Sequence, residues 1–184
     1  MKMTNFKKAE IQTGQLFMFL VMAFLFVLII GVFLYSYNLI TSSLASVSTS
    51  AGAVDFSNAT ALTMGKINTG LLNHGGLIAL FLLFGQLISM VMIAYFTRDS
   101  NPSIFFIFEI LILIFVYILA TYISNAYETT LSAIPFSSIY TTNLNYATTF
   151  ILKLPLIVTI TGVIMMIIGY AGIPKTREEE VAGF

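Results

Sequence analysis

Cysteine is absent from this chain of 184 residues, and histidine occurs once, as His74. Without cysteine there can be no disulfide, no thiolate metal ligand and no cysteine nucleophile, and one histidine cannot form a two-histidine metal or haem site. Charge is equally scarce, because Lys, Arg, Asp and Glu make up 9% of the residues and the formal net charge is +0. A chain without net positive charge does not attract nucleic acid electrostatically. We therefore expect no nucleic-acid partner, no metal and no cofactor.

The standard catalytic motifs are missing as well. The sequence contains no GxSxG turn, no Walker A loop, no HExxH and no pair of carboxylates within an apolar run. We expect no enzymatic activity from the isolated chain, and a catalytic role only as part of a complex.

Apolar residues dominate instead: 58% of the chain is hydrophobic and the mean hydropathy is +0.96. This is too much apolar surface for a water-soluble domain of this size. An apolar run of about 20 residues crosses the hydrocarbon core as a helix, and the runs here are continuous rather than alternating, which argues against a barrel. The pattern predicts an all-α membrane protein, a single integral membrane domain over residues 1–184. Its four transmembrane helices are expected at about residues 16–37, 77–97, 103–124 and 150–171.

Two uncharged or weakly charged segments rich in serine and threonine separate these runs, at residues 36–73 and 127–149. We interpret both as exposed connections, the first longer than most loops. Within it, residues 57–72 are predicted to form a surface helix that is capped by Ser57 or Asn58 and turns its leucines and isoleucine toward the membrane. Asn58 also begins an N-glycosylation acceptor pattern, which matters only if this connection lies outside a cell that glycosylates.

The basic residues predict an orientation. With four spans, one side holds Lys2, Lys7, Lys8, Arg98, Lys175 and Arg177, and the other holds Lys66 and Lys153. Cytoplasmic segments of membrane proteins carry the excess of Lys and Arg. We therefore expect both termini in the cytoplasm and the two connections on the extracytoplasmic side of a cell membrane, with a viral membrane as the alternative.

One carboxylate, Glu109, lies inside an apolar run. Six residues at 1.5 Å each place it about 9 Å into the third span. A charge at the bilayer centre costs on the order of 2.5 kcal/mol or more, and less near the ends of a span, so Glu109 needs a partner or a proton. If the second and third spans pack antiparallel, Gln86 and Ser89 lie at a similar depth. This predicts an intramembrane polar cluster of Glu109, Gln86 and Ser89.

Small residues recur at helical spacing in and beside the second and fourth spans. Such residues allow neighbouring helices to approach closely. The predicted helix-packing positions are Gly75, Ala79, Gly85, Gly162 and Gly169.

Two functions from different classes fit these features. The first is a structural or accessory subunit of a larger membrane-embedded assembly, such as an energy-converting or transport complex or the membrane layer of a virus. Its partners would be membrane lipids and other subunits or copies of itself. The second is a small homo-oligomeric channel or proton-coupled carrier that uses Glu109, whose proton affinity desolvation would raise. We favour the first, because the chain offers few further polar groups for a transport pathway.

Overall fold

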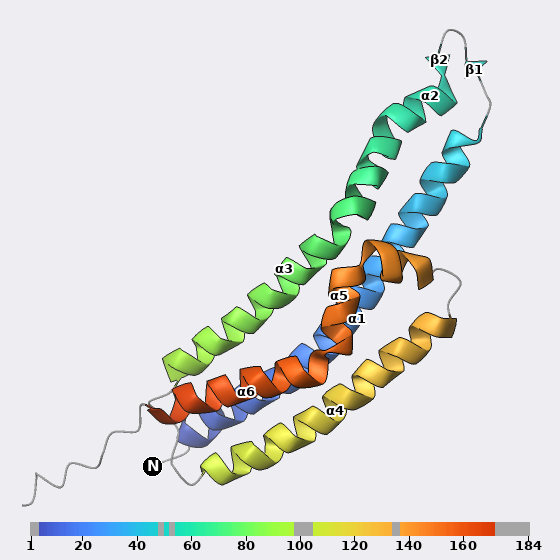
Figure 1. Cartoon of the computed structure of the whole chain (residues 1–184). Coiled ribbons are helices and arrows are strands. Elements are labelled where there is room, and N and C mark those ends of the chain that lie inside the picture. The colour runs from blue at the N-terminus through green and yellow to red at the C-terminus, as the bar shows by residue number, and fades with distance from the viewer. Residues whose placement is uncertain (1–3, 48–49, 52–53, 98–104, 134–136, 172–184) are drawn as a thin grey trace, which may run out of the picture.

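The computed structural model describes residues 4–47, 50–51, 54–97, 105–133 and 137–171. Within them the chain is helical apart from one two-residue β-ladder, so the predicted all-α class is confirmed (Figure 1). Three helical stretches are long and apolar enough to cross a membrane, Gly14–Ala45, Phe56–Phe96 and Phe106–Ser132. A fourth span exists only if Asn145–Leu152 and Leu154–Gly169, two helices bent by 68°, count as one.

A long helical hairpin organises the molecule. Its elements are α1 (Thr4–Ala45), β1 (Ser50–Ala51), β2 (Val54–Asp55), α2 (Phe56–Thr60), the π-helical turn η1 (Ala61–Gly65) and α3 (Lys66–Thr97). Helix α1 has 42 residues, which corresponds to a length of about 63 Å, twice the hydrocarbon thickness of a bilayer. The hairpin therefore extends well beyond the other helices (Figure 1). We call its projecting part, residues 36–74, the arm.

The structure corrects the expected ends of the first two spans. The segment after residue 36 continues α1 as far as Ala45, and the second helix already begins at Phe56. Two threonine hydroxyls of the arm bond to their own helix: Thr41 Oγ1 donates to the Tyr37 carbonyl at 2.9 Å, and Thr69 Oγ1 donates to the Gly65 carbonyl at 2.9 Å. Because these hydroxyls bond to the preceding turn, a serine- and threonine-rich sequence can remain helical.

The tip of the arm is closed by specific hydrogen bonds. Strands β1 and β2 pair antiparallel, with Ser50 opposite Asp55. The cap of α2 is Asp55 rather than Ser57 or Asn58, and its Oδ1 accepts from the Ser57 amide at 3.0 Å. Ser57 Oγ donates to the Ala45 carbonyl at 2.6 Å, which ties the second helix to the end of the first. The predicted separate surface helix over residues 57–72 is instead continuous with α3.

The remaining helices pack around one half of the hairpin. They are α4 (Phe105–Ala133), the π-helical turn η3 (Ile139–Asn143), α5 (Asn145–Leu152) and α6 (Leu154–Ala171). Helix α4 packs against α6 and α1, whereas α3 packs against α1, α5 and α6. Helices α3 and α4 therefore lie on opposite sides of the α1–α6 pair (Figure 1). The core between these helices contains the fully buried side chains Leu20, Leu83, Val116 and Val158.

The expected fourth span at residues 150–171 is not one straight helix. Proline has no N–H, and its ring clashes with the carbonyl four residues earlier, so Pro155 cannot continue the helix from Ile151. The chain turns by 68° between α5 and α6. Ser124 Oγ of α4 donates to the Leu152 carbonyl at 3.0 Å, which satisfies a backbone oxygen at the bend.

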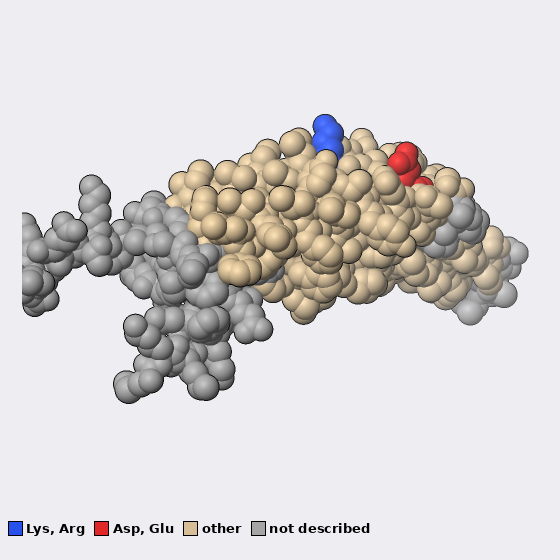
Figure 2. All heavy atoms as spheres, turned by 90° about the horizontal axis from the view of Figure 1, so that it is seen from below, with Lys and Arg blue, Asp and Glu red and all other residues tan. Residues whose placement is uncertain are grey.

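The described surface is poor in charge. Basic and acidic atoms occupy only small areas of the face in Figure 2, and the rest of the described residues there are uncharged. On α4 the exposed side chains Ile107, Leu111, Ile114 and Ile118 recur at helical spacing. Apolar side chains exposed on this scale are compatible with insertion into a membrane.

Candidate functional site

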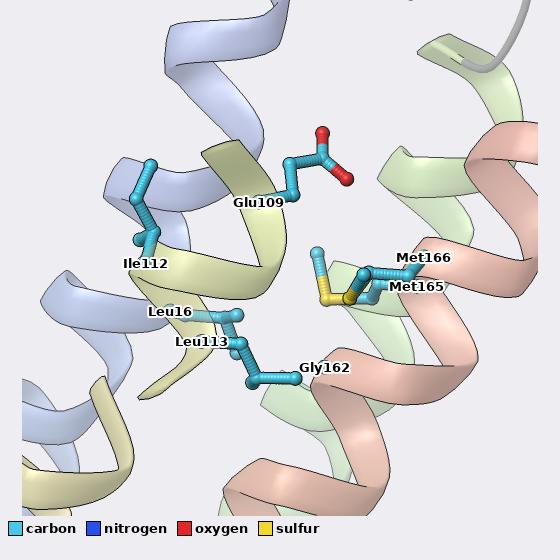
Figure 3. Close-up of a pocket in the computed structure, with 7 residues that line it drawn as sticks. All are labelled: Leu16, Glu109, Ile112, Leu113, Gly162, Met165 and Met166. Carbon is cyan, nitrogen blue, oxygen red and sulfur yellow. The ribbon is translucent and has the colours of Figure 1, made fainter. Parts of the chain in front are cut away.

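Glu109 lines a small cavity between α1, α4 and α6 (Figure 3). The cavity has a volume of about 30 Å³, and such a space holds a water molecule. The Glu109 carboxylate points away from Ile112 and toward the side on which Met165 and Met166 lie. The other lining residues are Leu16, Ile112, Leu113, Gly162, Met165 and Met166. The site therefore combines one acidic group with otherwise apolar walls.

The structure does not bring the predicted polar cluster together. Glu109 is on α4, whereas Gln86 and Ser89 are on α3, on the other side of the α1–α6 pair. Ser89 is exposed and Gln86 is half-buried. The prediction assumed that consecutive spans are neighbours in space, but α6 and α1 separate these two helices.

A half-buried polar side chain of α1, Gln15, is not among the predicted site residues. Gln15 precedes the cavity residue Leu16 on α1, and its Oε1 is buried without a hydrogen-bond partner among the described residues. The sequence gives no sign of this burial, because Gln15 lies at the beginning of the first apolar run, where a surface residue is expected.

The predicted packing positions have different outcomes. A Cβ at Gly162 would collide with the Leu113 side chain of α4, and one at Gly75 would lie 3.1 Å from Leu34 Cδ1 of α1, so both glycines lie at close helix contacts. Ala79 and Gly169 are buried. Gly85 is exposed, with open space around it. It makes no close helix contact with the described part of the chain.

A second site lies where the bundle meets the arm, and Tyr140 of η3 is its centre. The Tyr140 side chain is fully buried, and its hydroxyl donates to the Leu28 carbonyl of α1 at 2.7 Å. The ring lies against Gly31, where any Cβ would overlap it. Burial raises the pKa of the Tyr140 hydroxyl above its ordinary value, so the group stays protonated and remains a donor.

A chain of hydroxyl groups connects Tyr140 to α4. Thr148 Oγ1 donates to the Tyr140 carbonyl at 2.9 Å, and Tyr127 Oη lies 3.0 Å from Thr148 Oγ1. Since a threonine hydroxyl carries one proton, Tyr127 must be the donor in the second bond. The two tyrosine rings meet edge to face at 6.2 Å. We call Leu28, Tyr127, Tyr140 and Thr148 the junction cluster. Each of its three side-chain hydroxyl groups takes part in a hydrogen bond.

The segment from η3 to α5 also packs closely against α3. Asn143 Nδ2 donates to the Leu72 carbonyl at 3.0 Å. A Cβ at Gly76 would lie only 2.5 Å from the Asn143 carbonyl oxygen, so the two backbones touch. The segment from η3 to α5 is therefore wedged between α1 at Gly31 and α3 at Gly76, and fixes the base of the arm to the bundle.

The remaining candidates stand apart from both sites. Asn58 is exposed in α2 at the end of the arm, and His74 is exposed on α3. Among the residues that the structure describes, no three His, Cys, Asp or Glu side chains come together as metal ligands. Compared with protein families, with curated proteins and with solved structures, the chain matches none.

Proposed function

We propose that this chain is a structural or accessory subunit of a larger membrane-embedded assembly. The observation that carries the proposal is the uncovered apolar surface of the arm. Leu62 and Ile67 are each 56% exposed in a part of the hairpin that projects beyond the bundle. Apolar side chains that neither lipid nor the protein's own helices cover are typical of surfaces that bind a partner.

In this proposal the bent pair α5–α6 supplies the fourth membrane crossing. The excess of basic residues then faces the cytoplasm together with both termini, and the arm extends on the extracytoplasmic side. The host membrane is that of a cell or of a virus. An arm held above the bilayer can reach other subunits that lipid-facing helices cannot.

The junction cluster supports the same function. Its buried hydrogen bonds join α1, α4, α5 and η3 at the base of the arm. Fully satisfied buried polar networks make a packing arrangement unique and rigid. A rigid base is what a docking arm needs, because a partner then meets one preformed surface.

We expect the protein to leave native membranes in mild detergent as a particle larger than a monomer. Replacing Leu62 and Ile67 by alanine should release the partner subunits. Each truncation removes about 1.5 kcal/mol of apolar burial, so the pair should weaken the contact roughly 100-fold. The measurement is native-size analysis with identification of the proteins that co-purify.

The matched control replaces Ile88 and Met92, two exposed residues of α3 within the bundle, by alanine. These side chains face lipid in the proposed arrangement, and their truncation should leave the assembly intact. A stable monomer from native membranes would contradict the subunit function. Equal dissociation of both double variants would contradict the role of the arm.

The Glu109 cavity favours a second candidate function, a proton- or cation-coupled carrier formed by several copies. A carboxylate beside a space for one water is the minimum that such a pathway requires. The other lining residues are apolar, however, and they offer no further groups along which an ion could move. We therefore place Glu109 as a polar anchor between α4, α6 and α1.

Reconstituted vesicles separate these two functions. Under a pH gradient we expect no flux above that of empty vesicles, and we expect Glu109→Gln to lower the yield of the assembly without changing flux. Glu128→Gln, which removes an exposed carboxylate from the same helix, should change neither. A flux that Glu109→Gln abolishes, with the assembly preserved, would establish the carrier instead.

A further inference from the structure

A pocket that is open to the surface lies between the two helices of the arm. Its volume is about 470 Å³, whereas the cavity beside Glu109 has a volume of about 30 Å³. Small-molecule sites in proteins have volumes of about 300–1,000 Å³, so the pocket of the arm has room for an organic ligand. Most of the residues that line it are polar: Asn38, Thr41, Ser42, Lys66, Asn68 and Thr69.

Three small residues leave this space between the helices. Ala45, Ala61 and Gly65 also line the pocket, and a Cβ at Gly65 would meet only the Thr60 carbonyl oxygen, at 3.7 Å. Ala61 and Gly65 are the two ends of the π-helical turn η1. Single π-helical turns of this kind occur frequently at functional sites.

Lys66 gives the pocket one positive charge. Asp55 is the only carboxylate in the sequence of the arm, and its Oδ1 accepts from the Ser57 amide at the tip. The helix between Asp55 and Lys66 is about 16 Å long, which exceeds the screening length of about 8 Å at physiological salt. The charge of Lys66 is therefore not neutralised by the arm itself, and it attracts an anion. Lysine commonly binds phosphate groups as a point charge.

The hydroxyl groups of the pocket residues act as acceptors toward a ligand. Thr41, Ser42 and Thr69 each donate the hydroxyl proton to a backbone carbonyl three or four residues earlier, at 2.9 Å. Their oxygens can then only accept a further hydrogen bond. Asn68 Oδ1 is also an acceptor, buried without a donor among the described residues. Acceptors of this kind complement the hydroxyl groups of a polyol.

We propose that the pocket of the arm binds a polyol phosphate, with the phosphate at Lys66 and the polyol hydroxyl groups at the serine and threonine side chains. The headgroup of a phospholipid and a dissolved polyol phosphate share this chemistry. The inference goes beyond the proposed subunit function and does not depend on it, because the arm residues Leu62 and Ile67 do not line the pocket.

Titration of glycerol phosphate into the full chain in detergent tests the site, with the heat of binding measured by calorimetry. We expect saturable binding. Glycerol lacks the charge and inorganic phosphate lacks the polyol, so each should bind at least about tenfold more weakly. No saturable binding of glycerol phosphate would overturn the proposal, and so would equal affinities for glycerol phosphate and inorganic phosphate.

Two pairs of variants locate the binding in the pocket. Gly65→Leu should abolish it, because the new side chain fills the pocket, whereas Gly70→Leu should not, because Gly70 is on α3 outside the pocket and a Cβ there has nothing within 4 Å. Lys66→Gln should weaken binding about tenfold or more. Lys153→Gln, which removes an exposed lysine at the bend before α6, should leave it unchanged. Equal effects within either pair would overturn the proposal.

Competition distinguishes the two sources of the ligand. Displacement of glycerol phosphate by phosphatidylglycerol in phosphatidylcholine micelles, but not by phosphatidylcholine alone, would identify a lipid headgroup. Binding of glycerol phosphate that phosphatidylglycerol does not displace would identify a dissolved polyol phosphate. A monomeric particle from native membranes would remove the subunit function and leave this site standing, so the two proposals fail separately.

Discussion

Replacing Tyr140 by alanine should lower the melting temperature of the purified protein in detergent by about 12 °C. The ring is fully buried against Gly31, and its hydroxyl bonds to the Leu28 carbonyl. Truncating a buried aromatic side chain costs about 4 kcal/mol, and in a protein of this size each kcal/mol corresponds to about 3 °C. Thermal unfolding followed by circular dichroism measures the shift.

Tyr146→Ala provides the control, because Tyr146 is an exposed tyrosine in the neighbouring helix α5. We expect it to change the melting temperature by about 2 °C or less, as for most surface substitutions. Tyr140→Phe keeps the ring and removes only the bond to Leu28, and should cost about 1 kcal/mol. A Tyr140→Ala protein as stable as Tyr146→Ala would show that the wedge does not hold the arm to the bundle.

Gly76→Ala is expected to destabilise the protein although alanine is the better helix former. The new methyl group would lie 2.5 Å from the Asn143 carbonyl oxygen and 3.3 Å from the Leu144 α-carbon. Both atoms belong to the backbone, so relief requires η3 to move away from α3. Overpacking of this kind costs about 3 kcal/mol, more than the gain of about 1 kcal/mol in helix propensity.

The same substitution at Gly70 separates the two effects. Gly70 is on α3 as well, but a Cβ there has nothing within 4 Å. Gly70→Ala should therefore raise the melting temperature by about 3 °C, which corresponds to about 1 kcal/mol. If both variants were stabilised alike, the close contact at Gly76 would be refuted.

The helical character of the chain follows from its sequence, because continuous apolar runs of about 20 residues have one stable form in lipid. The positions at which the helices end cannot be predicted from the sequence in the same way. Serine and threonine usually favour caps and turns, which suggested that α1 ends near residue 37. Contacts between the two arm helices override that preference: Asn68 Nδ2 donates to Asn38 Oδ1 at 2.8 Å, a bond that no local pattern reveals.

Which helices are neighbours in space could not be predicted from the sequence either. A short link between two spans suggests that they are neighbours, and this assumption predicts that Glu109 lies beside Gln86 and Ser89. Instead α6, the last of the described helices, packs against α4. A close contact between Gly162 and Leu113 makes this pairing possible. Such complementarity depends on shape at particular positions, and hydropathy does not record it.

The contacts of the junction cluster also could not be predicted from the sequence. Tyr140 and Thr148 lie in a segment that composition marks as a polar connection, yet both are buried. Gly31 is one small residue in an apolar run, and the tyrosine that fills its place is 109 residues away in the chain. Recognition of such a pair from sequence would need substitutions that vary together.

Helix α1 is unbroken from Thr4 to Ala45 and is gripped by Tyr140 at Gly31. It is also held on either side of that point, where Phe19 and Leu20 are buried in the bundle and the bond from Ser57 Oγ to the Ala45 carbonyl fixes its far end. A sideways load on the tip of the arm would therefore be shared among these contacts and would not turn α1 about any one of them.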